Sequence, residues 1–275
     1  MRLTTRSVAA LAALTVAACS DTTSTAAPTA ATFAALRTPS PDTVGTPDLI
    51  VDARRLATSW EVGAEFFAAT SCSTIEGGIE PGEHRALRFT VATPNIGTAD
   101  LYVGDPAAHF DPNGDGDPSD GDGLFEFASC HEHYHFLNYA TYELYPVLAD
   151  GALGTPIRSA KQGFCMRDNK QVGGPHRRPY YLECGAPARN GVPAIPGNQG
   201  ISTGWSDIYA NSLPGQLFIV DGLSPGDYLI RITANPPFAA QPGAVCPHTD
   251  AQGFCHMFEE SDYGNNVAET RIRLQ

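Results

Sequence analysis

Three histidines occupy alternate positions in the short segment His131-Glu132-His133-Tyr134-His135. Because alternate side chains of a β-strand share one face, we expect the three imidazoles to project toward a single point. Imidazole nitrogen binds copper, zinc, iron or nickel, and three such ligands leave positions open for water, dioxygen or substrate. The spacing therefore predicts a metal centre at His131, His133 and His135, in preference to a solvated face that carries three histidines. It does not select the metal, since zinc hydrolases also combine three histidines with a bound water.

The N-terminus carries the pattern of an export signal. Arg2 and Arg6 precede an apolar run at 8–18, which is too short to cross a bilayer and is typical of a signal peptide. Small residues then stand directly before Cys19, which resembles the bacterial lipobox, where the cysteine is lipidated and becomes the first mature residue. We therefore expect an exported protein of the bacterial cell envelope that meets the membrane only through a lipid anchor on Cys19. Ordinary cleavage without lipidation would give a secreted protein instead.

Composition divides the chain into three parts. We expect a signal peptide at 1–18, a lipidated cysteine with a disordered Thr-, Ala- and Pro-rich linker at 19–46, and one domain at 47–275. The formal net charge of −13 argues against nucleic acid as a partner and favours amines or basic polypeptides. The sequence makes no prediction of the oligomeric state.

Apolar residues of the domain alternate more often than they follow a helical period. We therefore predict a mainly β fold, with an antiparallel β-sandwich-like core, long irregular loops and little helix. Helix is expected only around 54–67, and a tight turn at Ser224-Pro225-Gly226-Asp227. The predicted strands are 86–91, 101–103, 125–145, 216–220, 228–233 and 267–274.

With Cys130 in front of it, the histidine segment resembles the copper-binding signature of the lysyl oxidase family, in which cysteine precedes H-x-H-Y-H. The similarity extends from Pro47 to the C-terminus. By this resemblance, His131, His133 and His135 together bind one copper ion.

Lysyl oxidases also carry a lysine tyrosylquinone, which is built by joining a lysine side chain to an oxidised tyrosine. The resemblance assigns this cofactor to Lys161, just before a Phe-Cys pair, and to Tyr209, which ends the family's D-x-Y pattern. The chain has two lysines, Lys161 and Lys170, so an accidental match is improbable. Burial of the lysine would lower its pKa and supply the neutral amine that the cross-link needs.

The resemblance implies a copper amine oxidase of the lysyl oxidase (protein-lysine 6-oxidase) type. Such an enzyme uses dioxygen to convert peptidyl lysine or small primary amines into aldehydes, with release of ammonia and hydrogen peroxide. Two other interpretations remain: a copper-binding lipoprotein without oxidase activity, and a three-histidine zinc hydrolase. Neither of them explains why Lys161 and Tyr209 stand where they do.

The catalytic base stays unassigned at this stage. Animal members carry a histidine shortly after the copper motif, but the segment 138–143 of this chain has none. Glu143, Asp207 and His176 are candidates on chemistry alone.

Two groups of oxygen donors are candidate calcium ligands. Family members begin with P-D-L and end with E-S-D-Y-x-N-N, segments that together hold a calcium ion, and the alternative is a polar turn. A second group has the D-x-N-x-D-G spacing of a calcium loop with a carboxylate at its end, and the alternative is a solvated acidic loop. The first group is Asp48, Leu49, Glu260, Asp262, Asn265 and Asn266; the second is Asp111, Asn113, Asp115 and Asp122.

Six cysteines follow Cys19, an even number that predicts three disulfides in an exported domain. The absence of a C-x-x-C pair argues against a thiolate metal site. Family resemblance suggests that the pairs are Cys72 with Cys130 and Cys165 with Cys184, which leaves Cys246 with Cys255.

Overall fold

The structure is a computed structural model that describes residues 44–113, 115, 117, 119, 121–159, 161, 163–174, 178–239 and 246–275. The predicted signal peptide, the lipidated Cys19 and most of the linker fall within 1–43, outside the described residues, and stay predictions. Within the described ranges, no helix is both long enough and apolar enough to cross a membrane.

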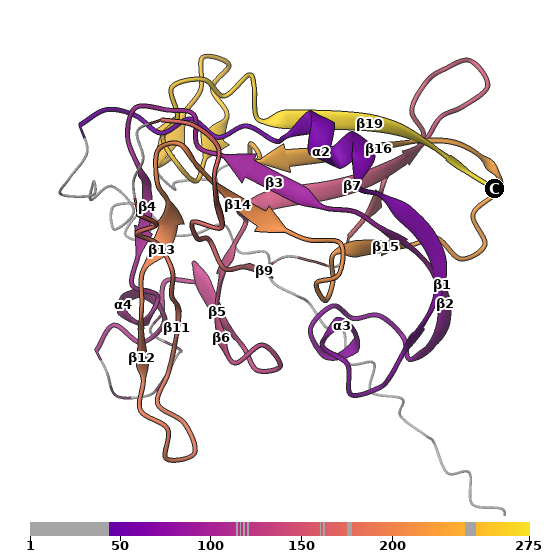
Figure 1. Cartoon of the computed structure of the whole chain (residues 1–275). Coiled ribbons are helices and arrows are strands. Elements are labelled where there is room, and N and C mark those ends of the chain that lie inside the picture. The colour runs from indigo at the N-terminus through magenta and orange to yellow at the C-terminus, as the bar shows by residue number, and fades with distance from the viewer. Residues whose placement is uncertain are drawn as a thin grey trace, which may run out of the picture.

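Strands dominate the domain, as predicted, and they form several small antiparallel sheets. The largest sheet has the order β19-β16-β7-β8, and β19, β16 and β7 run alongside one another across the top of Figure 1. Its strands are β7 (Ala140–Pro146), β8 (Ile157–Arg158), β16 (Gly226–Ala234) and β19 (Val267–Leu274).

Three further sheets surround the residues that are predicted to form the metal and cofactor site. Their orders are β10-β14-β3, β1-β2-β15 and β5-β6-β9. The first consists of β3 (Val91–Pro94), β10 (Lys170–Gln171) and β14 (Trp205–Tyr209). The second consists of β1 (Glu61–Phe67), β2 (Gly82–Arg88) and β15 (Leu217–Ile219). The third consists of β5 (Phe125–Ala128), β6 (His133–Leu137) and β9 (Gly163–Phe164).

The remaining elements are short. Two-stranded pairs are β4 (Leu101–Gly104) with β13 (Gln199–Ile201), β11 (Cys184–Ala186) with β12 (Ile195–Gly197), and β17 (His248–Thr249) with β18 (Cys255–His256). The helices are α2 (Ala53–Thr58), α3 (Cys72–Ile75) and α4 (Ala107–Phe110).

An aromatic layer joins the sheets around the site. Phe164 of β9 makes edge contacts with Tyr142 of β7 and with Tyr209 of β14, at ring-centre distances of 5.7 and 5.1 Å. Phe89 packs against Tyr142 and stacks on Phe218 at 5.4 and 5.0 Å. Because these rings are buried and in mutual contact, they fix β9 and β14 relative to the large sheet.

The helix expected at 54–67 is confirmed only in its first half. Asp52 caps α2 by accepting a hydrogen bond from the Arg55 backbone N–H at 2.9 Å, and the helix ends at Thr58. The second half is β1, which pairs antiparallel with β2 along its whole length, from Glu61 opposite Arg88 onward. The prediction is wrong there because pairing with β2, the next strand along the chain, outweighs local helical preference.

The apolar stretch 125–145 is divided into β5, β6 and most of β7 by two turns. Glu132 and Asn138 lie in these turns with φ angles of 59° and 61°, in the left-handed region that residues with a Cβ seldom adopt. The turns aim β6 inward between β5 and β9.

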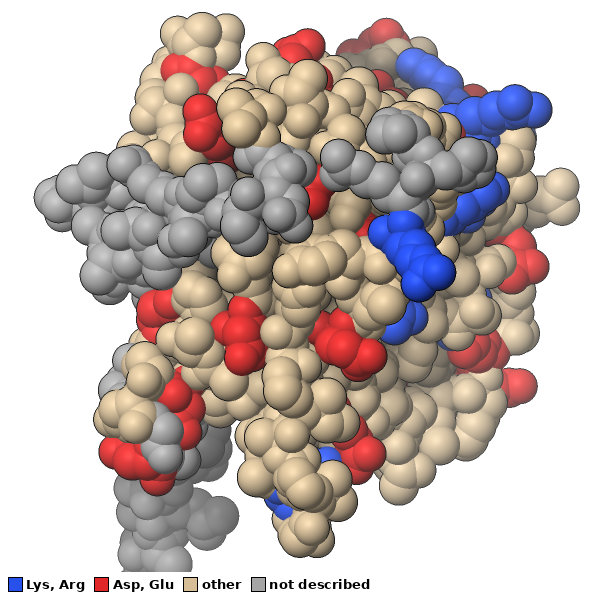
Figure 2. All heavy atoms as spheres, turned by 60° about the vertical axis from the view of Figure 1, so that its left-hand side comes forward, with Lys and Arg blue, Asp and Glu red and all other residues tan. Residues whose placement is uncertain are grey.

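The charge of the chain is visible on its surface. On the face in Figure 2, Asp and Glu side chains are spread over much of the molecule, whereas Lys and Arg gather toward one side. Such a surface favours the approach of cationic ligands.

Candidate metal and cofactor site

The rings of the three predicted histidine ligands lie close together, but their ligand atoms form two groups: His131 and His135 lie with Glu76, and His133 lies with the sulfur atoms of Cys165 and Cys184. His133 and His135 lie on β6, whereas His131 lies in the turn before it, so the prediction that all three sit on one strand is wrong for His131. The turn at Glu132 still brings its ring to the others. The ring centres are 5.7 Å apart for His131 and His133, 5.2 Å for His131 and His135, and 4.9 Å for His133 and His135.

The ring-centre separations match those of three imidazoles around one ion, although the ligand atoms of His133 do not join the group formed by Glu76, His131 and His135. A metal–nitrogen bond of about 2 Å puts each ring centre about 3 Å from the metal, so tetrahedrally arranged rings lie about 5 Å apart. Burial lowers the pKa of His131, and burial together with the neighbouring histidines lowers the pKa of His133 to about 4. Both rings are therefore neutral at pH 7 and keep a lone pair for a metal.

Glu76 is a carboxylate of the metal cluster that sequence reasoning missed. It follows α3 directly, and its Oε2 contacts His131 Nδ1, while its Oε1 accepts the Cys130 backbone N–H at 2.5 Å. One side-chain atom from each of Glu76, His131 and His135 lies within 4.8 Å of the others. The disulfide between Cys72 and Cys130 ties α3 to the histidine turn and so keeps Glu76 in place.

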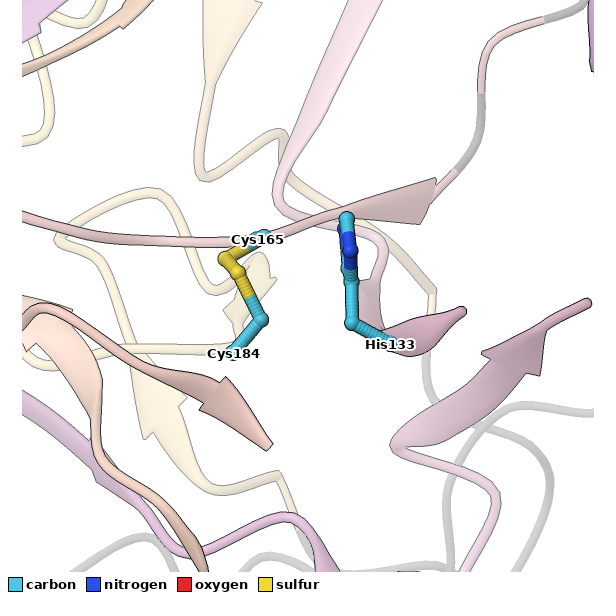
Figure 3. Close-up of side chains that lie close together, drawn as sticks. All are labelled: His133, Cys165 and Cys184. Atoms are coloured by element: carbon cyan, nitrogen blue, oxygen red, sulfur yellow. A yellow bond between two sulfur atoms is a disulfide. The ribbon is translucent and has the colours of Figure 1, made fainter. Parts of the chain in front are cut away.

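A second disulfide flanks the cluster on the other side. Figure 3 shows His133 beside the bond that joins Cys165 to Cys184. The Cys165 carbonyl accepts the hydroxyl of Tyr209 at 3.0 Å. The segment that carries this disulfide therefore connects the metal cluster with the predicted cofactor tyrosine.

All three predicted disulfide pairs are confirmed, the two that the family resemblance implies and the one that was left by elimination. Cys72 joins Cys130, Cys165 joins Cys184, and Cys246 joins Cys255. The cysteines are therefore cross-links, and the sulfur atoms near His133 are not free thiolate ligands.

The two predicted cofactor residues lie next to each other. Lys161 Nζ is 5.2 Å from the centre of the Tyr209 ring and 5.0 Å from that of Phe164. Burial lowers the pKa of Lys161 to about 8, against the opposing effect of nearby carboxylates led by Asp207. Burial also raises the pKa of Tyr209, as does the charge of Asp207. The pair thus combines a readily deprotonated amine with a neutral phenol.

Lys161 lies near the histidine cluster because the backbones of β9 and β6 approach each other closely. β9 pairs with the end of β6, where Gly163 lies opposite Leu137. A Cβ atom on Gly163 would lie only 2.7 Å from the Cβ of His135, so the lack of a side chain there allows the contact. The Lys161 N–H also bonds to Ser159 Oγ at 3.3 Å.

A cavity of about 460 Å³ opens onto these groups. This volume is in the range of small-ligand sites. Its lining includes His131, His135, Lys161, Glu76 and Glu126. Glu126 is half exposed, and its Oε1 lies 3.7 Å from His135 Nδ1. The cavity thus places two carboxylates beside the lysine and the histidines.

The three candidate bases differ in their surroundings. Glu143 accepts the Tyr145 hydroxyl at 2.7 Å and pairs with Arg158 at 3.3 Å, so its carboxylate is engaged away from the cavity. His176 lies outside the described residues. Asp207 is buried on β14, two residues before Tyr209.

The first candidate calcium group is brought together from both ends of the domain. Asn265 donates to Asp48 at 2.9 Å, and the Leu49 N–H donates to Glu260 at 2.6 Å. Among the described residues, the buried amide oxygens of Asn265 and Asn266 have no hydrogen-bond partner, which fits donors that await a cation. Calcium binding stays a prediction here.

Asp262, the sixth member of that group, is exposed and accepts the N–H of Gly264 at 2.7 Å. The Asp262 carboxylate therefore stabilises the turn in which Asp262 itself lies.

The second candidate calcium loop is held by local hydrogen bonds. The Asp115 N–H donates to Asp111 at 3.1 Å and to Asn113 at 2.9 Å, while Asp122 contacts His109 Nδ1 at 2.6 Å. Gly114 and Gly116 of this loop lie outside the described residues. The described contacts are those of a solvated acidic loop, and calcium binding there stays a prediction.

Comparison with known proteins agrees with this geometry. A family model described as Lysyl oxidase matches residues 64–244. The chain is 26% identical over 239 residues to Protein-lysine 6-oxidase of Rattus norvegicus, an alignment that covers 83% of this chain and 46% of that relative. The chain is 25% identical over 239 residues to the protein of the same name from Sus scrofa, and that alignment covers 83% of this chain and 77% of the relative. Lysyl oxidase homolog 3A of Danio rerio is 30% identical over 158 residues, 57% of this chain and 17% of that relative.

The chain spans about half the length of the rat relative. The family match covers well over half of the chain and includes the histidine cluster, Lys161 and Tyr209. On this evidence, the chain belongs to the lysyl oxidase family.

Proposed function

We propose that this protein is a copper- and quinone-dependent amine oxidase, which converts primary amines, free or in lysine side chains, into aldehydes. The overall reaction consumes the amine, dioxygen and water, and it releases the aldehyde, ammonia and hydrogen peroxide. The relatives named Protein-lysine 6-oxidase support lysine as a substrate class.

One observation carries the proposal. Lys161 Nζ lies 5.2 Å from the Tyr209 ring, and both the lysine and two of the histidines face the same cavity. A metal-binding protein without oxidase chemistry has no need for a desolvated lysine beside a buried tyrosine. A zinc hydrolase has no need for it either, since zinc is not redox-active.

The chain's own residues have distinct tasks. His131, His133 and His135 would hold copper, and Lys161 and Tyr209 would form the quinone. Together these groups supply an acceptor for two electrons, which leave with dioxygen as hydrogen peroxide. Phe164 contacts the Tyr209 ring at 5.1 Å and keeps it from turning away from Lys161.

The cavity walls favour a cationic substrate. Glu76 and Glu126 line the cavity beside Lys161. A primary amine arrives mainly as an ammonium ion at neutral pH, and carboxylates attract it while the low polarity of the interior strengthens that attraction. Part of the cavity wall is formed by Gly78 and Gly215, whose missing side chains leave room for an extended amine.

We further propose that the domain works outside the cytoplasm, tethered through Cys19 and a linker. The three disulfides support this, because such bonds persist in oxidising compartments.

The test is a visible spectrum of the copper-loaded protein before and after phenylhydrazine, which reacts with the carbonyl of a quinone. Wild type is expected to give a coloured product and a Lys161–Tyr209 cross-linked peptide by mass spectrometry. Lys161→Ala and Tyr209→Phe should give neither. Lys170→Ala and the half-exposed Tyr180→Phe are matched controls that should behave as wild type.

A wild-type protein that binds copper without the coloured product or the cross-link would reject the proposal in favour of a copper-binding protein. Zinc-dependent hydrolysis without either product would favour the hydrolase.

A further inference from the structure

Asp207 is a carboxylate held in the interior at the edge of the proposed cofactor. Asp207 is 1% exposed, and its Oδ2 has no hydrogen-bond partner among the described residues. A buried carboxylate oxygen without a donor costs free energy, so its presence calls for an explanation.

The position of Asp207 on β14 points this carboxylate at the cofactor residues. Asp207 and Tyr209 are two residues apart on one strand, so their side chains share a face and their Cα atoms lie about 7 Å apart. The Tyr209 hydroxyl donates to the Cys165 carbonyl at 3.0 Å and also lies within hydrogen-bonding reach of the Asp207 carboxylate. Lys161 and Tyr209 both feel the charge of Asp207.

The groups that face Asp207 from neighbouring elements are few among the described residues. Lys161 and Arg167 act on it as positive charges. The hydroxyl-bearing rings of Tyr139, Tyr142 and Tyr209 lie close enough for its charge to raise their pKa values.

The two carboxylates that line the cavity are engaged or solvated. Glu76 contacts His131 and accepts the Cys130 N–H, so it is committed to the metal cluster. Glu126 is half exposed and faces His135. Asp207 differs from both because it is buried behind the cavity lining, two residues before Tyr209 on β14, and because its Oδ2 has no hydrogen-bond donor among the described residues.

We propose that Asp207 is the catalytic base, and that its Oδ2 takes the proton from the substrate carbon that bears the nitrogen. This inference rests on the proposed amine oxidase function. In the step, the C–H bond of that carbon breaks, the proton goes to Asp207, and the electron pair goes to the quinone. The substrate carbon is thereby oxidised by two electrons and the quinone is reduced by two, and dioxygen later removes them as hydrogen peroxide.

The acidity of Asp207 suits this task. Burial raises the pKa of Asp207 to about 7, against the opposing effects of its hydrogen-bonding surroundings and the charges of Arg167 and Lys161. A base with a pKa near the working pH is ionised often enough to act and still accepts a proton strongly.

The experiment separates cofactor formation from proton removal. Phenylhydrazine reacts at the quinone without the removal of a proton from carbon, whereas benzylamine turnover requires it. The variants are Asp207→Asn, Glu126→Gln as the competing base, and Asp227→Asn, an exposed aspartate at the start of β16, as the control. Copper content and melting temperature are measured for each, together with anaerobic bleaching of the visible band by benzylamine and by its α-dideuterated form.

Asp207→Asn is expected to keep the copper and the phenylhydrazine colour of wild type while benzylamine bleaching slows by about 10²–10⁴-fold. In wild type, kcat/KM should rise with pH through an inflection near 7, because only the ionised carboxylate accepts the proton, and the variant should lose this inflection. Asp227→Asn should match wild type in every measurement.

The assignment is overturned if Asp207→Asn keeps its colour and its bleaching rate stays within about threefold of wild type. It is equally overturned if Glu126→Gln alone loses the step that is sensitive to deuterium. Failure of the proposed function looks different, because wild type itself would then give no colour with phenylhydrazine.

Discussion

Replacing Gly163 by alanine should weaken copper binding although Gly163 binds no metal itself. The added Cβ would lie 2.5 Å from Glu126 Oε1, 2.6 Å from His135 Nδ1 and 2.7 Å from His135 Cβ. Ordinary contacts between heavy atoms lie at about 3.5–4.0 Å, so about 1 Å of space is missing. Glu126 is half exposed and can swing aside, but the Cβ of His135 is fixed to β6. The His135 ring or strand β9 must therefore move.

A displacement of that size matters because metal–ligand distances are held to about 0.2 Å. We expect copper affinity to fall about 10–100-fold, the range seen when the support of a ligand is disturbed. Overpacking should also cost about 1–3 kcal/mol of stability, which lowers the melting temperature by roughly 2–4 °C per kcal/mol in a domain of this size.

The assay is a competition titration with a copper chelator, with thermal unfolding of the metal-free protein alongside. Gly173→Ala is the matched control, because a Cβ there meets no atom within 4 Å. The reasoning is refuted if Gly163→Ala binds copper within about threefold of wild type, since the ligand would then tolerate the crowding.

Three further predictions concern other parts of the chain. Glu76→Gln should lower copper affinity about 10-fold or more by loosening His131, and exposed Glu83→Gln should not, as chelator competition would show. Burial raises the pKa of Glu260 from 4.5 to about 7, so the folded protein binds this proton more tightly than the unfolded chain does. The contribution of the protonated carboxyl to the free energy of unfolding is therefore complete below pH 4.5 and is lost as pH rises through 7. The melting temperature of wild type should fall over this pH range, and that of Glu260→Gln should not. Added calcium should restore the melting temperature of wild type. Cys19→Ser should move the protein from the membrane to the soluble fraction of an expressing bacterium.

Local pattern was sufficient for the features that repeat over a few residues. The β class followed from alternation of apolar residues, and the metal prediction followed from the spacing of His131, His133 and His135. Lys161 and Tyr209 carry no pattern of their own and were found only through resemblance to a family. The same resemblance predicted two disulfide pairs and left Cys246 with Cys255 as the third, and the structure confirms all three.

Features made by distant segments could not be predicted in this way. Glu76 lies 54 positions before Cys130, and only the fold and a disulfide bring the two together. The left-handed turn at Glu132 separates His131 from the strand, and no glycine in the sequence predicts this turn. The burial of Asp207 depends on β3, β10 and the aromatic layer, so its unusual acidity is a property of the tertiary structure.

The two disulfides that flank the histidine cluster give the protein a form of latency. Cys72–Cys130 holds Glu76 against His131, and Cys165–Cys184 lies beside His133. If these cysteines were reduced, neither side of the cluster would be fixed, so the proposed copper would be held weakly and the proposed cofactor would have no stable frame in which to form. A reducing compartment keeps them in that state. A producer of hydrogen peroxide would thus be silent where it is synthesised and become competent only where its thiols are oxidised.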